Sequence, residues 1–196
     1  YEIVLRGPLK TATVKYELKE RREGSAERES FGTQDAVYLL MPDRFANGNT
    51  ENDNVKGYLQ GVDNTDLHHR QGGDIEGIIQ HLDYIADLAY ADKNRIYVLG
   101  GSAGGRCTWE FVWRHPDYVA AAISLCGECM QVADMNAEKL VRIKDVPLWI
   151  AHDETDNAVS IKLDDFCVEE LKKLSSPVIY SRYNKYGHMI ARAFYF

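Results

Sequence analysis

The fold of this chain is decided by residues 95–105, which read Arg95-Ile96-Tyr97-Val98-Leu99-Gly100-Gly101-Ser102-Ala103-Gly104-Gly105. The apolar run 95–99 predicts a short buried strand, and residues 104–115 predict a helix. Between them, residues 100–104 fit the pattern G-x-S-x-G, in which a sharp turn from strand to helix exposes a serine hydroxyl. Glycines on either side of the serine let neighbouring backbone approach closely. The stretch therefore predicts a strand–turn–helix unit with Ser102 at its turn.

Strands and helices continue to alternate after this unit. Apolar runs predict strands at residues 118–126, 146–151 and 177–183. Helical periodicity predicts helices at residues 137–143 and 160–174, which lie between these strands. Alternation of this kind predicts an α/β protein, with a parallel sheet that helices cover on both faces.

Further elements are expected before this region. In chain order they are a hairpin of strands at 2–6 and 11–18, a buried strand at 36–41, a long polar loop at 43–73 and a helix at 74–90. The hairpin follows from two β-rich runs around the turn signal Gly7-Pro8, and the strand at 36–41 from a continuous apolar run that a proline ends. Loops as long as 43–73 are usually functional or disordered.

An acid and a histidine follow two of the predicted strands. Asp156 lies in the loop after strand 146–151, and His188 lies in a loop after strand 177–183. The carboxyl ends of parallel strands meet at one edge of a sheet, where such sheets build their sites. The chain order serine, acid, histidine is the order expected after a G-x-S-x-G turn. We therefore predict a triad in which Ser102 is the nucleophile, His188 the base and Asp156 the acid.

The acid has two alternatives in the same loop. Asp153 and Glu154 come directly after strand 146–151, and either could contact the histidine. Asp156 is favoured because it lies deeper in the loop, before Val159.

Two backbone groups are candidates for an oxyanion hole. The N–H of Ala103, the residue after the nucleophile, is expected to be one donor. A second donor should come from the loop after an earlier strand, where Met41 can offer an N–H and Pro42 cannot.

The second half of the chain resembles a known group of enzymes. Six stretches of residues 92–196 resemble the C-terminal half of α/β-hydrolase esterases, namely 94–105, 108–110, 115–117, 120–122, 146–152 and 186–188. This group includes feruloyl and related carbohydrate esterases and peptidase-like hydrolases. The resemblance implies an α/β-hydrolase-like three-layer sheet and a serine esterase acting on carboxylic esters, including acyl or feruloyl esters of plant sugars. The family usually has Gly where this chain has Asp153.

The first half resembles a different family. Residues 35–48 and 72–78 are similar to the start of the catalytic barrel in the α-amylase superfamily, of the cyclomaltodextrinase or neopullulanase type. Residues 1–32 resemble the end of the β-domain that precedes such barrels. A complete α/β barrel needs about 250 residues, so only its opening would be present. The alternative function is therefore an α-amylase-type glycoside hydrolase, or a non-catalytic sugar- or calcium-binding remnant of one.

The amylase resemblance implies a calcium loop. In that family the polar loop can hold calcium, and the matching positions here are Asn47, Asn49, Asn52, Asp53, Gly72 (through its carbonyl) and Asp74. Oxygen-rich ligands of this kind suit calcium. Asn49 stands where the family often has Asp, which lowers the charge of the site. The alternative is a polar surface loop without metal. The serine chemistry itself requires no cofactor.

These resemblances predict a mosaic chain with three segments. Residues 1–32 would be a hairpin segment, 33–91 an amylase-like strand, loop and helix, and 92–196 a hydrolase half with the triad. A buried strand and an amphipathic helix are interchangeable parts if their apolar faces match. We therefore expect the amylase-like segment to complete one esterase-type sheet, in a single folded unit.

Composition narrows the range of partners. The net charge of −7 disfavours binding to nucleic acid, which needs clustered Lys and Arg. The apolar runs are too short to span a bilayer. Exposed edges of an incomplete sheet would favour a homodimer. The chain starts at Tyr1, not Met, so we expect a processed or engineered chain or a fragment, and its localisation is unassigned.

The four cysteines give no strong signal. Cys126 and Cys129 form a CxxC, but no second pair accompanies them as in a zinc site. The motif also follows a predicted strand instead of starting a helix, which argues against a redox motif. The prediction is that these are structural or loop cysteines.

Overall fold

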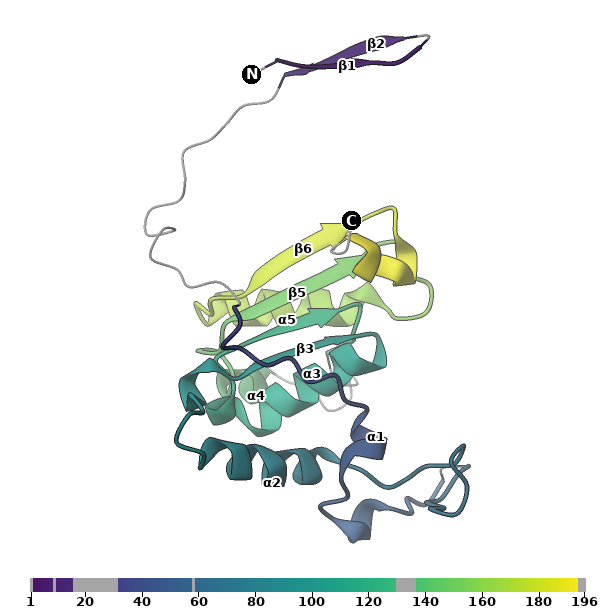
Figure 1. Ribbon diagram of the computed structural model, residues 1–196, viewed down its shortest axis with the longest axis vertical. Helices are drawn as coiled ribbons and strands as arrows, with labels where there is room; N and C mark the ends of the chain where they lie inside the picture. The colour runs from purple at the N-terminus through teal and green to yellow at the C-terminus, as the bar shows by residue number, and fades with distance from the viewer. Residues whose placement is uncertain (1, 9, 16–31, 58, 130–136, 194–196) are drawn as a thin grey trace. The chain divides into compact units, whose positions relative to one another are not determined.

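The computed structural model describes residues 2–8, 10–15, 32–57, 59–129 and 137–193 (Figure 1). Contacts within the chain divide it into two compact units, Tyr1–Leu40 and Met41–Phe196. Each unit is described by itself. The segment boundaries expected from the two resemblances stay a prediction.

The first unit contains the predicted hairpin. Strands β1 (Glu2–Arg6) and β2 (Thr11–Lys15) pair antiparallel, with Glu2 opposite Lys15. The turn between them is closed by a hydrogen bond of 2.9 Å from the Gly7 N–H to the Lys10 carbonyl. Residues 16–18, which were expected to extend the second strand, lie outside the described residues.

The predicted buried strand at 36–41 is wrong. This segment belongs to neither of the sheets found in the described residues. Its apolar side chains are largely exposed, with Val37 at 79% and Leu39 at 94%. A continuous apolar run indicates a preference for burial, but it does not identify a neighbouring strand with free N–H and C=O groups. The main sheet therefore begins at β3, without the strand that we expected this segment to add.

The second unit is built on a parallel sheet of four strands, β3 (Tyr97–Gly101), β4 (Ala121–Leu125), β5 (Leu148–Asp153) and β6 (Ile179–Tyr183). The strands lie in the order β3-β4-β5-β6, and each neighbouring pair is parallel. Each strand lies within two or three residues of the bounds that the sequence predicts. Figure 1 shows that all four run in one direction, so their carboxyl ends form one edge of the sheet.

Helical segments precede, connect and follow these strands. They are α1 (Pro42–Phe45), η1 (Thr50–Asn52), α2 (Ile75–Ala86), η2 (Lys93–Arg95), α3 (Ala103–Arg114), η3 (Pro116–Tyr118), α4 (Ala137–Val141), α5 (Ile161–Lys173) and η4 (Gly187–Ala193), where η marks a 3₁₀ segment. In the described part of the chain, no helix combines the length and the apolar character needed to cross a bilayer.

The main core lies between the sheet and its helices. Trp109 and Val112 from α3, Leu171 from α5 and Ile150 from β5 are among its buried members, and α2 packs against it. A second, smaller cluster on the sheet joins Leu125, Cys126 and Ala151 to Ile190 of η4. Successive residues of a strand face opposite sides, so the strand residues of these two clusters lie on opposite faces. The predicted α/β-hydrolase-like fold, a parallel sheet flanked by helices, is confirmed.

Helix α2 connects the polar loop to this core. The Asp74 side chain caps its first turn by accepting a hydrogen bond of 2.7 Å from the Gly77 N–H. Ile75, Ile78 and Leu82 lie on one face at helical spacing and pack against the main core. The helix predicted at 74–90 is therefore present, although it ends earlier, at Ala86.

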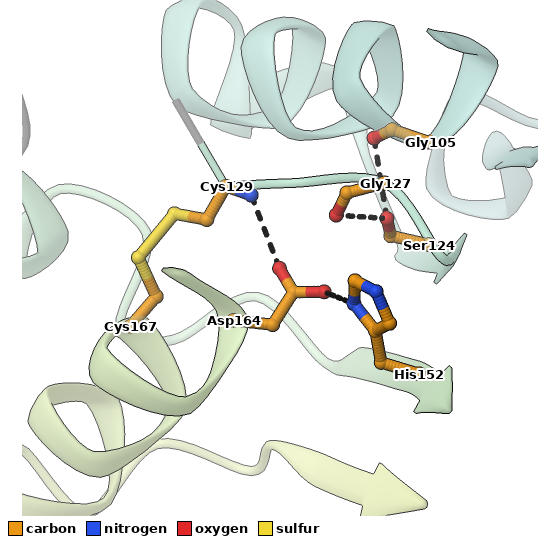
Figure 2. The surroundings of a disulfide bond; sticks show 7 residues. All are labelled: Gly105, Ser124, Gly127, Cys129, His152, Asp164 and Cys167. Atoms are coloured by element: carbon orange, nitrogen blue, oxygen red, sulfur yellow. Dashed lines mark hydrogen bonds and ion pairs between the residues drawn. A yellow bond between two sulfur atoms is a disulfide. The ribbon is translucent and has the colours of Figure 1, made fainter. Parts of the chain in front are cut away.

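One disulfide closes part of the second unit. It joins Cys129, in the segment after β4, to Cys167 in α5, across 38 residues of sequence (Figure 2). The two cysteines of the CxxC therefore do not pair with each other, and Cys126 is a free, buried thiol. The prediction that these cysteines are structural agrees with this bond.

Removing the disulfide is expected to destabilise the protein. Constraint of the unfolded chain by a loop of this length contributes roughly 2–4 kcal/mol. The double replacement Cys129→Ala and Cys167→Ala should lower the free energy of unfolding, measured in urea, by this amount. The exposed free Cys107 offers a matched control, because Cys107→Ser should leave that free energy almost unchanged. Equal stability of the double variant and the control would contradict the prediction.

Candidate active site

Ser102 sits at a strained turn between β3 and α3. Its backbone has φ +56° and ψ −122°, a combination that residues other than glycine rarely adopt. A hydrogen bond of 2.8 Å from its N–H to the Leu125 carbonyl holds the turn against β4. At Gly100, a Cβ would lie 2.1 Å from the Gly104 carbonyl oxygen, so only glycine fits there. The G-x-S-x-G stretch therefore forms the predicted strand–turn–helix unit.

After the serine, the glycine that neighbouring backbone approaches closely is Gly105, one residue later than the Gly104 of the sequence motif. A Cβ at Gly104 would meet nothing within 4 Å. At Gly105, in contrast, it would lie 2.8 Å from the Gly127 Cα, and a Cβ at Gly127 would lie 2.4 Å from the backbone of Gly105. Helix α3 can therefore approach the segment after β4 only because both positions are glycine.

Three side chains form a hydrogen-bonded series at the carboxyl edge of the sheet. The Ser102 hydroxyl lies 2.8 Å from His188 Nε2, and His188 Nδ1 lies 2.7 Å from Asp156 Oδ2. The His188 side chain is 28% exposed, and the Asp156 side chain is fully buried. The structure thus brings together the three residues predicted to form the triad, although they span 87 positions of sequence.

The Asp156 carboxylate is fixed by its own loop. Its Oδ1 accepts hydrogen bonds from the N–H groups of Ala158, at 2.8 Å, and Val159, at 3.0 Å. Burial disfavours its charge, but these donors and His188 outweigh burial and hold the pKa of Asp156 below its usual range. The acid is therefore ionised and oriented, with Oδ2 directed at the imidazole.

The two alternative acids have other partners. Glu154 lies on the surface, with its carboxylate 3.2 Å from the Arg182 guanidinium. Asp153 is fully buried and contacts neither the hydroxyl of Ser102 nor the ring of His188 in the hydrogen bonds of the described residues. Of the three acids, Asp156 is the one that contacts His188.

Asp153 joins two loops of the site. Its Oδ1 accepts from the N–H and the hydroxyl of Thr155, at 2.8 and 2.6 Å, in the loop of the acid. Its Oδ2 accepts from the N–H groups of Lys185, at 2.9 Å, and Tyr186, at 2.8 Å, just before the histidine. Sequence reasoning did not find this role. The available signal was that Asp153 stands where related esterases usually have Gly.

The two candidate oxyanion donors, Ala103 and Met41, lie at the starts of different helices. Ala103 begins α3 directly after Ser102, and N–H groups in the first turn of a helix have no partner within that helix. Met41 precedes α1, which packs on α2, and its carbonyl accepts a hydrogen bond of 2.9 Å from the Arg44 N–H. The oxyanion roles of both residues stay predictions.

The residues predicted to hold calcium form two groups in this loop. Asp74 accepts hydrogen bonds from the N–H groups of Gly48, Asn49 and Gly77 and from the Asn52 amide, at 2.7–3.0 Å. Asn47 donates to Asp53 at 2.7 Å, and both lie beside Gly72, whose φ is +86°. Because N–H donors occupy both oxygens of Asp74, a bound calcium would have to displace some of them. Calcium binding stays a prediction.

A cavity of about 430 Å³ adjoins this loop. Its lining residues are Pro42, Asn49, Asn52, Asp74, Ile75, Glu76 and Arg114. None of them is Ser102, Asp156 or His188, so this cavity is not the place where an ester would meet the serine.

A strained serine at a strand–helix turn, on a parallel sheet and next to an imidazole and a buried carboxylate, defines the class of α/β hydrolases. The model of the alpha/beta hydrolase fold family matches residues 31–157, more than half of the chain. The chain therefore belongs to the alpha/beta hydrolase fold family.

Individual relatives match shorter parts. Feruloyl esterase B of Thermothelomyces thermophilus is 36% identical over 61 residues, which are 31% of this chain and 21% of that protein. Beta/alpha-amylase of Paenibacillus polymyxa is 40% identical over 58 residues, 30% of this chain and 5% of that protein. The crystal structure of a thermostable esterase has 34% identity and a TM-score of 0.49, covering 55% of this chain and 27% of that one.

The extent of these matches limits what they establish. The chain spans between 5% and 21% of the length of four curated relatives that it matches. Family membership and esterase relatives support a hydrolase. The amylase alignments are short and partial, so an amylase origin for residues 1–90 stays a prediction.

Proposed function

We propose that this protein is a serine hydrolase that cleaves carboxylic esters through Ser102, His188 and Asp156. The observation on which the proposal rests is the hydrogen-bonded series from the serine hydroxyl through the imidazole to the buried carboxylate, at 2.8 and 2.7 Å. Both distances lie within the reach that nucleophilic catalysis requires of its nucleophile, base and orienting group.

The reaction follows from this geometry. The Ser102 hydroxyl oxygen attacks the ester carbonyl while its proton passes to His188 Nε2. The tetrahedral intermediate expels the alcohol, which takes that proton from the imidazole, and an acyl-serine remains. Water then attacks the acyl group while His188 accepts its proton, and His188 returns that proton to the Ser102 oxygen as the carboxylic acid leaves. Asp156 holds the Nδ1 proton and stabilises the imidazolium in both steps.

The proposed substrate class is based on the names of related proteins. Feruloyl esterase B is a relative whose name states an ester substrate. We propose acyl or feruloyl esters of carbohydrates as the substrates, with no cofactor in the chemical steps. Function depends on site details that a shared fold does not fix, so this assignment needs a direct comparison of esters.

The decisive experiment is covalent labelling of the serine. A fluorophosphonate probe should add once to the intact protein, and peptide mass spectrometry should place the adduct on Ser102. Ser102→Ala should abolish the labelling. Ser124→Ala is the matched control, because the Ser124 hydroxyl is buried and donates to the Gly105 carbonyl at 3.2 Å. Absence of labelling, or an adduct on another residue, would refute the proposal.

A glycoside hydrolase of the α-amylase type is the second candidate. The short amylase alignments favour it. Glycoside hydrolysis by that route requires two carboxyl groups that flank the scissile bond, and it does not use a serine nucleophile. Maltodextrin hydrolysis that persists in Ser102→Ala would favour this candidate. If the protein binds sugar or calcium but hydrolyses neither esters nor maltodextrins, it is the non-catalytic remnant.

A further inference from the structure

Behind the triad lies a second imidazole–carboxylate pair. His152 on β5 and Asp164 on α5 are both fully buried, and His152 Nδ1 lies 2.7 Å from Asp164 Oδ2 (Figure 2). The other oxygen of Asp164 accepts a hydrogen bond of 3.0 Å from the Cys129 N–H. Buried ionisable groups cost free energy unless they are paired. The reaction steps above do not use this pair.

The second nitrogen of His152 faces the acid of the triad. His152 Nε2 lies 3.3 Å from Asp156 Oδ2 and 3.2 Å from the Val159 carbonyl oxygen. Both neighbours are oxygens that accept hydrogen bonds, and a carbonyl oxygen cannot donate one. Nε2 therefore carries a hydrogen. Asp156 Oδ2 therefore has an imidazole nitrogen on each side, hydrogen-bonded at 2.7 Å in His188 and in ion-pair contact at 3.3 Å in His152.

The pKa values of both members of the buried pair are shifted in the direction that favours protonation. Burial disfavours the charged form of His152, but Asp164 and the other acceptors outweigh it and raise the pKa of His152. Burial likewise raises the pKa of Asp164. Both directions favour an extra proton on the pair, in addition to the one that a neutral imidazole carries, and such a proton allows hydrogens on Nδ1 and Nε2 together.

We propose that His152, held in place by Asp164, is a positioning residue that orients Asp156 and shares its Oδ2 with His188. This inference rests on the proposed serine-hydrolase function. His152 contacts no reacting atom and acts only through the acid. The loop N–H groups fix one oxygen of Asp156, and His152 fixes the other on the side away from His188.

The shared oxygen has a consequence for pH dependence. A second donor withdraws negative charge from Asp156 Oδ2, which reduces the stabilisation that this oxygen gives to an imidazolium at His188. Without that donor, protonation of the general base should persist to higher pH. The titratable groups that face Asp156 in the described residues are His188 from η4, His152 from β5 with Asp164 behind it, and the Cys126 thiol at the end of β4.

The disulfide lies beside Asp164, on the side away from His152 (Figure 2). Figure 2 shows Asp164 between the imidazole of His152 and the backbone of Cys129. Cys129 is bonded to Cys167, which lies one turn after Asp164 on the same helix. The covalent bond thus ties the segment that donates to the Asp164 carboxylate to the helix that carries Asp164.

Two amide replacements of His152 separate its two contacts. The amide nitrogen of Gln reaches approximately the position of His Nε2, whereas that of Asn reaches approximately the position of Nδ1. His152→Gln should keep a donor to Asp156, and His152→Asn should keep the contact to Asp164 but lose that donor. We expect kcat for a soluble aryl ester to fall by about 10- to 100-fold in His152→Asn. It should fall no more than about threefold in His152→Gln, a factor that corresponds to less than one hydrogen bond.

The pH profile distinguishes positioning from general damage to the fold. In His152→Asn the acid limb of kcat/KM should move upward by about 0.5–1 pH unit, with little change in KM. In His152→Gln the limb should stay in place. Equal losses in both variants, or an acid limb of His152→Asn that stays or moves downward, would overturn the inference.

A measurement on the unaltered protein does not depend on how the variants fold. In wild-type protein with ¹⁵N-labelled histidine, NMR should detect a hydrogen on Nε2 of His152 across neutral pH. A ring that lacks this hydrogen would overturn the inference. Failure of the function itself has a different signature, because the wild-type protein would then take no fluorophosphonate label whatever the state of His152.

Discussion

Asp156→Asn is expected to lower kcat for ester hydrolysis by about 10⁴-fold, with the folded structure retained. The Asn carbonyl oxygen would keep the N–H donors of Ala158 and Val159, so its NH₂ group would face the imidazole. His188 would then have to present an unprotonated Nδ1 and carry its hydrogen on Nε2. In that tautomer it cannot accept the proton of Ser102. Steady-state kinetics with a soluble ester, together with circular dichroism, would measure this loss.

Glu154→Gln is the matched control for this prediction. Glu154 lies two residues from Asp156 in the same loop, and its carboxylate pairs on the surface with Arg182. Exposed pairs of this kind contribute little to stability, so kcat should change by less than about twofold. A small loss in Asp156→Asn, or a large loss in Glu154→Gln, would mean that the acid has been assigned to the wrong residue.

Asp153→Asn should produce the largest loss of stability among single substitutions near the site. The carboxylate is buried and accepts four hydrogen bonds from three residues. An amide can accept only on its oxygen, so its NH₂ group would face donors of either Thr155 or the Lys185–Tyr186 backbone. Leaving buried donors unpaired should cost roughly 3–5 kcal/mol in the free energy of unfolding. Because the bonds fix the histidine loop, kcat should fall as well.

The same carboxylate predicts how stability depends on pH. Burial disfavours the charge of Asp153, but the four donors outweigh burial and hold its pKa far below the usual range. As pH falls through about 4, the usual Asp pKa, the unfolded chain therefore binds a proton before the folded protein does. The contribution of Asp153 is complete above that pH and decreases below it.

Urea unfolding at a series of pH values would measure both effects. The difference in free energy of unfolding between wild type and Asp153→Asn should be constant from pH 7 to about pH 5 and should shrink toward pH 3. Asp145→Asn is the control, because that side chain is 86% exposed and pairs with the adjacent Lys144. A difference that grows as the pH falls would contradict the assigned direction of the pKa shift.

The sequence predicted the parts of the molecule that depend on local pattern. The strands at β3 to β6 follow apolar runs, and the turn at Ser102 follows the spacing of its glycines. The order of strands in a parallel sheet then places His188 and Asp156 at the edge where Ser102 lies. Helix α2 was predictable for the same reason, because its apolar residues repeat at helical spacing.

The remaining features depend on contacts that no local pattern encodes. The run at 36–41 has the composition of a buried strand, but a strand exists only where a neighbour offers hydrogen bonds. His152 and Asp164 are 12 positions apart and read separately as a strand end and a helix acid. Their pairing, like the bridge from Asp153 to the histidine loop, appears only when β5 lies beside α5 and β6. The sequence does not reveal that His152 and Asp153, at the end of β5, are both buried, and their contacts could not be predicted without that information.

The last two residues of β5 perform opposite tasks. Consecutive strand residues face opposite sides of a sheet, so His152 reaches the α5 side while Asp153 reaches the loop before η4. Deleting one residue within β5 would bring the Asp153 carboxylate to the place that faces Asp164. Inserting one would bring the imidazole of His152 to the backbone donors that now bind Asp153. Evolution can therefore vary the composition of this strand far more easily than its length.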